Sequence, residues 1–145
     1  MRKQGGARSM TARMWLRVSA VLSLLFAAGH SLGGRKQWSP MGDNPVLRMM
    51  KAVQFQTMGV SRSYYDFFMG FGISLSISML TQAFVLWFMA DLATSHAARL
   101  RPMILVFLVA SLAGVVVAWQ YIFPIPALFS LVLCATLGMA ALNAR

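Results

Sequence analysis

The chemistry open to this chain rests on few side chains, since it has three acidic residues, two histidines and a single cysteine. Among them, His30 and Asp66 stand at the ends of long apolar segments. An imidazole and a carboxylate at such positions can pair, and the carboxylate would then orient the ring and hold it partly charged. Such a pair can polarise a carbonyl, move a proton or anchor the head group of a ligand.

Helical spacing gives these residues a common direction. At 100° per residue, His30 falls within about 20° of Ser19 and Ser23, and Asp66 shares a side of its segment with Gly70. We therefore expect a polar pocket at one end of a helix bundle, which would bind a lipophilic small molecule. Its expected lining is His30, Asp66, Tyr65, Tyr121 and Gln120.

A plainer interpretation of the same residues stays open. Asp66 would then pair with Arg62, one turn earlier, and only start its helix, because charge pairs at this spacing are common and structural. Four aromatic residues would belong to the aromatic belt at the membrane surface, namely Tyr64, Tyr65, Trp87 and Trp119.

Four uncharged apolar runs would position these residues, and a helix needs about 20 such residues to cross a bilayer. The first run is short, but it extends if Arg17 snorkels its charge to the head groups. Runs without alternation do not suit barrel strands, so the expected fold class is all-α, a bundle of four transmembrane helices. The runs are Val18–Leu32, Phe67–Ala90, Pro102–Phe123 and Ile125–Ala144, and the expected helices are about 15–32, 65–90, 102–122 and 125–144.

Composition agrees with a membrane protein, since 59% of the 145 residues are hydrophobic and 11% are charged. Four crossings leave little chain for a soluble part, so residues 1–145 are expected to form a single membrane domain. The net charge of +10 does not indicate nucleic acid as a partner. Basic residues gather in the ends and loops of membrane proteins because anionic lipid and the insertion machinery favour them there.

The distribution of basic residues predicts the orientation. Of the 13 Lys and Arg residues, most fall in the two termini and the second loop, and fewer fall in the first loop. The positive-inside rule then places both termini in the cytoplasm of a bacterium, with the bundle in its inner membrane. An alternative is that the segment Val18–Phe26 belongs to a signal peptide cleaved before His30.

Small residues spaced by four recur in every apolar run, a pattern that lets transmembrane helices approach closely. They predict one inward face per helix, with Ser23, Gly70, Ser74, Gly114 and Gly138 at the helix contacts. The pattern fits equally well if some of these faces bind another copy of the chain or another membrane protein.

The first loop, residues 33–63, is too long to be only a link. Asn44 followed by Pro45 is typical of a helix start, and Gly59 is typical of a helix stop. Val46 and Met49 fall on one side of this segment, so we expect a short helix lying along the membrane surface. Its role would be that of an anchor or of a lid over the pocket.

Other classes of site find little support. Cys134 alone can form neither a disulfide within the chain nor a metal site, and it does not suit oxidoreductases that need paired cysteines. His30 and His96 are expected on opposite sides of the membrane, which excludes a haem between them. No recognisable catalytic motif is present, so no cofactor is expected and an enzymatic role is left open.

The segment Arg62–Gly72, with the sequence RSYYDFFMGFG, resembles a family of small bacterial four-helix membrane proteins of uncharacterised function. Its members carry a similar segment at the start of helix two, with Trp at the position of Tyr65. They also have a small residue followed by His near the end of helix one, matched here by Gly29 and His30. The resemblance implies the four-helix topology and brings no reaction, cofactor or substrate with it.

Two functions are therefore carried forward. The first is binding of a lipophilic small molecule in the polar pocket, which the predicted orientation places toward the outer side of the membrane. The second is that of a structural or accessory subunit whose small-residue faces contact a larger membrane complex.

Overall fold

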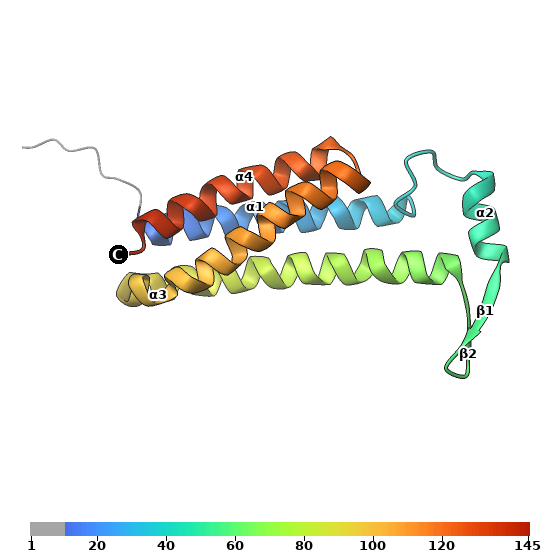
Figure 1. The fold of residues 1–145 in the computed structure, drawn as a ribbon, viewed down its shortest axis with the longest axis horizontal. Coiled ribbons are helices and arrows are strands. Elements are labelled where there is room, and N and C mark those ends of the chain that lie inside the picture. The colour runs from blue at the N-terminus through green and yellow to red at the C-terminus, as the bar shows by residue number, and fades with distance from the viewer. Residues whose placement is uncertain (1–10) are drawn as a thin grey trace, which may run out of the picture. The chain divides into compact units, whose positions relative to one another are not determined.

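The computed structural model describes residues 11–145, which are mostly helical. The expected all-α class is confirmed, with the addition of one small hairpin. The elements in chain order are α1 (Ala12–Arg35), α2 (Pro45–Ala52), β1 (Gln54–Thr57), β2 (Val60–Ser63), α3 (Tyr64–Tyr121) and α4 (Pro124–Asn143) (Figure 1).

Three helices of the described part are long and apolar enough to cross a membrane, namely α1, α3 and α4. Their apolar side chains remain largely unburied within the chain, since only 17% of the most apolar window of α3 is buried. Exposed apolar helices of this length are compatible with a membrane protein, because lipid is the solvent that suits such surfaces.

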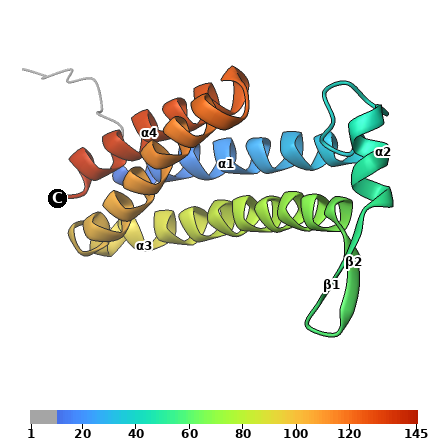
Figure 2. The ribbon, with the colours of Figure 1, turned by 45° about the vertical axis from the view of Figure 1, so that its right-hand side comes forward.

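Helix α3 differs from the two helices expected over its length. Its 58 residues are interrupted at His96, whose backbone has φ −132° and ψ 31° and is not helical. Figures 1 and 2 show the ribbon turning back within the yellow stretch of α3. The loop expected between residues 90 and 102 is therefore wrong. Its Ala-, Arg- and Leu-containing sequence is too good a helix former to remain a loop, although its charges lower the hydropathy.

Side chains beside His96 satisfy backbone and ring groups at this break. The Thr94 hydroxyl donates to the carbonyl of Asp91 at 2.8 Å. The Ser95 hydroxyl lies 2.8 Å from Nδ1 of His96. Short polar side chains of this kind compete with helical hydrogen bonds, which is why a turn forms here.

The chain divides into two compact units, which are described separately. The first contains the described residues up to Ser23 and Ala83–Arg145. Its apolar core joins α1, both arms of α3 and α4, and Leu16, Leu86, Ile104 and Leu137 are fully buried there. The Ser19 hydroxyl in α1 donates to Oγ1 of Thr136 in α4 at 2.8 Å, which pairs two polar groups inside this core.

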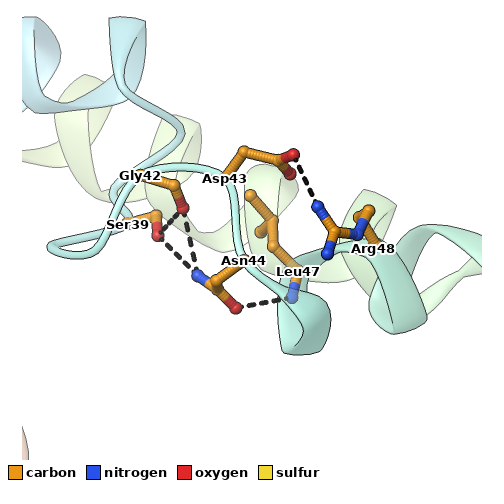
Figure 3. A network of polar contacts seen from close by, with 6 residues as sticks. All are labelled: Ser39, Gly42, Asp43, Asn44, Leu47 and Arg48. Atoms are coloured by element: carbon orange, nitrogen blue, oxygen red, sulfur yellow. Dashed lines mark hydrogen bonds and ion pairs between the residues drawn. The ribbon is translucent and has the colours of Figure 1, made fainter.

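The second unit is Leu24–Gln82. It contains α2, which begins at the Asn44-Pro45 step as expected. Oδ1 of Asn44 accepts a hydrogen bond from the backbone N–H of Leu47 at 3.0 Å, and Pro45 is the first helical residue. The Asn44 amide also donates to the Ser39 hydroxyl, and Arg48 pairs with Asp43 at 3.0 Å (Figure 3). These contacts fix where the helix starts.

The end of α2 is not where the sequence indicated. The helix stops at Ala52, and β1 and β2 follow as an antiparallel hairpin in which Thr57 pairs with Val60. Gly59, expected as a helix stop, instead lies in the hairpin turn with φ 81°, next to Met58 with φ 48°. Two positive φ angles are what a two-residue turn between twisted strands requires.

Candidate functional site

Asp66 acts at the start of α3, together with Ser63. The Asp66 carboxylate accepts hydrogen bonds from the backbone N–H of Ser63 at 2.8 Å and from its hydroxyl at 2.9 Å. In return, the Ser63 oxygen accepts the backbone N–H of Asp66 at 3.1 Å. This reciprocal arrangement is a capping box, which satisfies free N–H groups at a helix start. Asp66 thus starts a helix, but its partner is Ser63, and no ion pair between Arg62 and Asp66 is found among residues 11–145.

The carboxylate still has accessible surface beside its capping bonds. A shallow depression begins at this point and follows one side of the first three turns of α3. Phe67 and Phe71 are exposed in it, by 49% and 71%. The depression therefore has charged groups at one end and apolar groups along the rest. Its lining residues are Arg62, Asp66, Phe67, Gly70, Phe71 and Ser74.

His30 contacts a different part of α3. Its Nδ1 atom lies 2.9 Å from the Ser76 hydroxyl, a distance at which a hydrogen bond joins α1 to α3. No hydrogen bond or ion pair links His30 to Asp66 among residues 11–145. A serine next to an imidazole is the minimal nucleophile and base pair, but the described contacts give this histidine no carboxylate to orient it.

Trp38 fills the space beside His30. Its Nε1–H donates to the carbonyl of His30 at 2.8 Å, and the two rings lie 5.2 Å apart at their centroids. The indole lies against Gly33, Gly34 and Gly72, where added Cβ atoms would come within 3.2, 2.8 and 2.5 Å of it. Trp38 itself has φ 45°, a left-handed conformation that is costly for a bulky residue. Three glycines thus form the seat of this side chain.

Tyr65 lies next to the same loop. Its hydroxyl donates to Oε1 of Gln37 at 3.1 Å, and Nζ of Lys51 lies 4.7 Å from the centre of its ring. Tyr121, by contrast, belongs to the first unit together with Gln120, and 79% of its surface is exposed. The expectation that all five residues line one pocket stays a prediction.

The packing face of α3 is not the one expected in this region. Gly70 and Ser74 are exposed, and an added Cβ at Gly70 would meet no atom within 4 Å. Gly72 and Ser76 are half-buried instead and carry the contacts to Trp38 and His30. Both pairs have the same spacing of four, so spacing alone could not tell which face packs.

The other expected packing residues differ in their surroundings. Ser23 is buried. An added Cβ at Gly114 would lie 3.5 Å from the Ser130 hydroxyl, so this glycine faces α4 in ordinary contact. Among residues 11–145, no atom lies within 4 Å of a Cβ added at Gly138, so this glycine forms no close helix contact with the described part of the chain.

The first unit also contains a charged cluster that was not expected from the sequence. Arg17, which was expected to extend its charge to the head groups, forms an ion pair with Asp91, and its guanidinium carbon lies 3.4 Å from the ring centre of Trp87. Arg13 lies 3.6 Å from the same carboxylate. A signal was present, because Arg13 and Arg17, and likewise Trp87 and Asp91, are four residues apart on their helices.

No group of three His, Cys, Asp or Glu residues that could hold a metal is found in the described part of the chain. None of the family models, curated proteins or solved structures with which the chain was compared matches it.

Proposed function

We propose that this chain is an integral membrane protein that crosses the bilayer four times and binds an amphipathic molecule beside Asp66. The crossings are α1, the two arms of α3 on either side of His96, and α4. A straight helix of 58 residues would be about 87 Å long, against a hydrocarbon core of about 30 Å. The break at His96 supports two crossings within α3.

The orientation follows from the basic residues. With both termini in the cytoplasm, the break at His96 lies on the cytoplasmic side, and the start of α3 lies on the outer side. The bacterial inner membrane is the proposed location, and the resemblance of Arg62–Gly72 to small bacterial membrane proteins supports it.

The observation that carries the binding proposal is the depression that begins between Arg62 and Asp66 and continues past Phe67 and Phe71. Two opposite charges at one end match a zwitterionic head group, with its phosphate at the arginine and its ammonium at the carboxylate. The aromatic rings match an apolar chain, which would lie along α3 toward Ser74. A lipid-like molecule at the outer membrane surface has this arrangement of groups.

The capping contacts of Asp66 suit such a role. Because Ser63 holds the carboxylate through two hydrogen bonds, its position is fixed before a ligand arrives, and little conformational entropy is lost on binding. Arg62 is held less firmly, through one bond from Nη1 to the carbonyl of Ser61 at 2.8 Å. Its remaining donors are available to a phosphate.

Native mass spectrometry of the full chain with bound lipid tests this proposal. The Asp66→Asn variant keeps an oxygen that can accept from Ser63, so the helix start should survive while the negative charge is lost. We expect a discrete bound molecule on the wild type and its loss from this variant. Asp43→Asn is the matched control, because Asp43 is also exposed and also lies near an arginine. Equal ligand retention in all three proteins would refute the proposed site.

A role as an accessory subunit is the second candidate, favoured by the exposed small residues Gly70 and Ser74, which no part of the described chain covers. A partner helix would occupy the same depression as a lipid. The two candidates respond differently to charge: Asp66→Asn should remove a lipid and leave a helix contact intact. Gly70→Leu should remove both, because its side chain fills the depression.

A further inference from the structure

Near its start, α1 carries a second depression, lined by Arg13, Met14, Arg17 and Val18. Two cationic side chains and two apolar ones therefore border the same hollow. Met14 and Val18 are exposed by 49% and 36%. These residues belong to the first unit and are separate from the site beside Asp66.

Charge is only partly balanced within this cluster. Asp91 is the single carboxylate that contacts the two arginines in the described part of the chain, so the three groups carry a net positive charge. Arg17 is tightly held between Asp91 and the face of Trp87. Its Nη1 group is buried and has no hydrogen-bond partner among the described residues. The chain itself thus leaves part of the cationic group uncompensated.

Arg13 is the more available of the two. It lies 3.6 Å from Asp91 and keeps 51% of its side-chain surface exposed. A pair at this distance and exposure is weak, so an anion competes easily for the guanidinium. Because an arginine presents several N–H donors in one plane, it suits phosphate oxygens in particular.

The apolar residues beside the arginines indicate whether the ligand is free phosphate or the phosphate group of a lipid. Met14, Val18 and Val21 follow one another at spacings of four and three, and all are exposed, so they form one apolar stripe on α1. A free phosphate has no group for this stripe, whereas an acyl chain does.

We propose that Arg13 and Arg17 bind the phosphate of an acidic phospholipid, whose acyl chain lies along Met14, Val18 and Val21. This inference rests on the proposed topology, which puts the start of α1 at the cytoplasmic leaflet. Acidic lipids and basic side chains near a membrane-spanning helix attract one another there. The site differs from that beside Asp66 in its net charge and in the leaflet it faces.

Native mass spectrometry with added phosphatidylglycerol or phosphatidylcholine of the same acyl chains tests the proposal. The wild type should retain one phosphatidylglycerol in preference to phosphatidylcholine. Arg13→Gln should weaken that retention about tenfold, the size expected for the loss of a charge-assisted hydrogen bond. Because Arg13 is half exposed, this variant should fold. Arg101→Gln is the matched control, since it removes one charge from another exposed position.

Three results would overturn the proposal. Equal retention of the two lipids would show that the charge is not recognised. Equal losses in Arg13→Gln and Arg101→Gln would show that net charge alone attracts the lipid. Displacement of the lipid by millimolar inorganic phosphate would show that the site takes free phosphate. Asp66→Asn should leave phosphatidylglycerol retention unchanged, so failure of this site and failure of the outer site are distinguishable.

Discussion

The contacts that stabilise the first unit internally differ in kind from those that stabilise the second. In the first, a continuous apolar core surrounds Leu16, Leu86 and Leu137, which have no exposed surface. Among residues 24–82, only Ala27, Leu47 and Ser63 are buried. That unit depends on hydrogen bonds and on one indole seated among glycines.

The contrast lies in the core, since both units leave apolar side chains exposed. In the first unit Phe88 and Trp119 are exposed by 64% and 72%, outside the core that the helices share. In the second unit the outer faces of α3 carry exposed aromatic side chains such as Phe67 and Phe71, which need lipid, a ligand or another chain to cover them. The proposed outer site lies on such a face.

The largest change in the free energy of unfolding is expected for a substitution in the core of the first unit. Leu86→Ala should lower the free energy of unfolding by about 2–5 kcal/mol, because it removes a fully buried side chain and leaves a cavity. Leu80→Ala, at an exposed position of the same helix, should change it by less than about 0.5 kcal/mol. Unfolding in mixed micelles measures both. Similar losses would mean that the two units do not differ in packing.

A smaller effect is expected where Trp38 meets α3. Gly72→Ala puts a Cβ 2.5 Å from the indole, so Trp38 must shift, at a cost of about 1–3 kcal/mol. Gly70→Ala, where the added Cβ meets nothing, is the control and should be neutral or slightly stabilising. Tryptophan fluorescence should shift in Gly72→Ala alone. If Gly72→Ala changed neither the fluorescence nor the free energy of unfolding, the close contact described between Trp38 and Gly72 would be contradicted.

The smallest effect concerns the bond between His30 and Ser76. Ser76→Ala removes it and should cost about 0.5–1.5 kcal/mol of unfolding free energy, since the histidine nitrogen loses its partner. Ser74→Ala removes an exposed hydroxyl two residues away and should have no measurable effect. If both variants behave alike in the same unfolding experiment, the bond does not contribute to stability.

Much of the fold could be predicted from the sequence, and the reasons are physical. Long uncharged runs have one stable conformation in lipid, so the helices were predictable from hydropathy. The start of α2 was predictable because Asn44 and Pro45 fix it by local chemistry. The hairpin was not predictable, because a glycine such as Gly59 is as typical of a helix stop as of a hairpin turn. Its strands are only four residues each.

The candidate site was less predictable. Asp66 was singled out correctly as a residue at the start of a helix, but its partner Ser63 was not identified. The contacts of Trp38 depend on a left-handed backbone and on glycines from two helices, which no local pattern reveals. The ion pair between Arg17 and Asp91 joins residues 74 positions apart. Helical spacing shows only that Arg17 shares a face of α1 with Arg13, and that Asp91 shares a face of α3 with Trp87; it does not show that the two faces meet.

Cysteine accessibility tests the central claim, that α3 crosses the membrane twice and so separates the two proposed sites. Ser61→Cys and Ser95→Cys would be made singly in a Cys134→Ser background and treated with a membrane-impermeant maleimide on intact cells. The account predicts labelling of Ser61→Cys from outside, and of Ser95→Cys only after the membrane is opened. Labelling of both from the same side would contradict it.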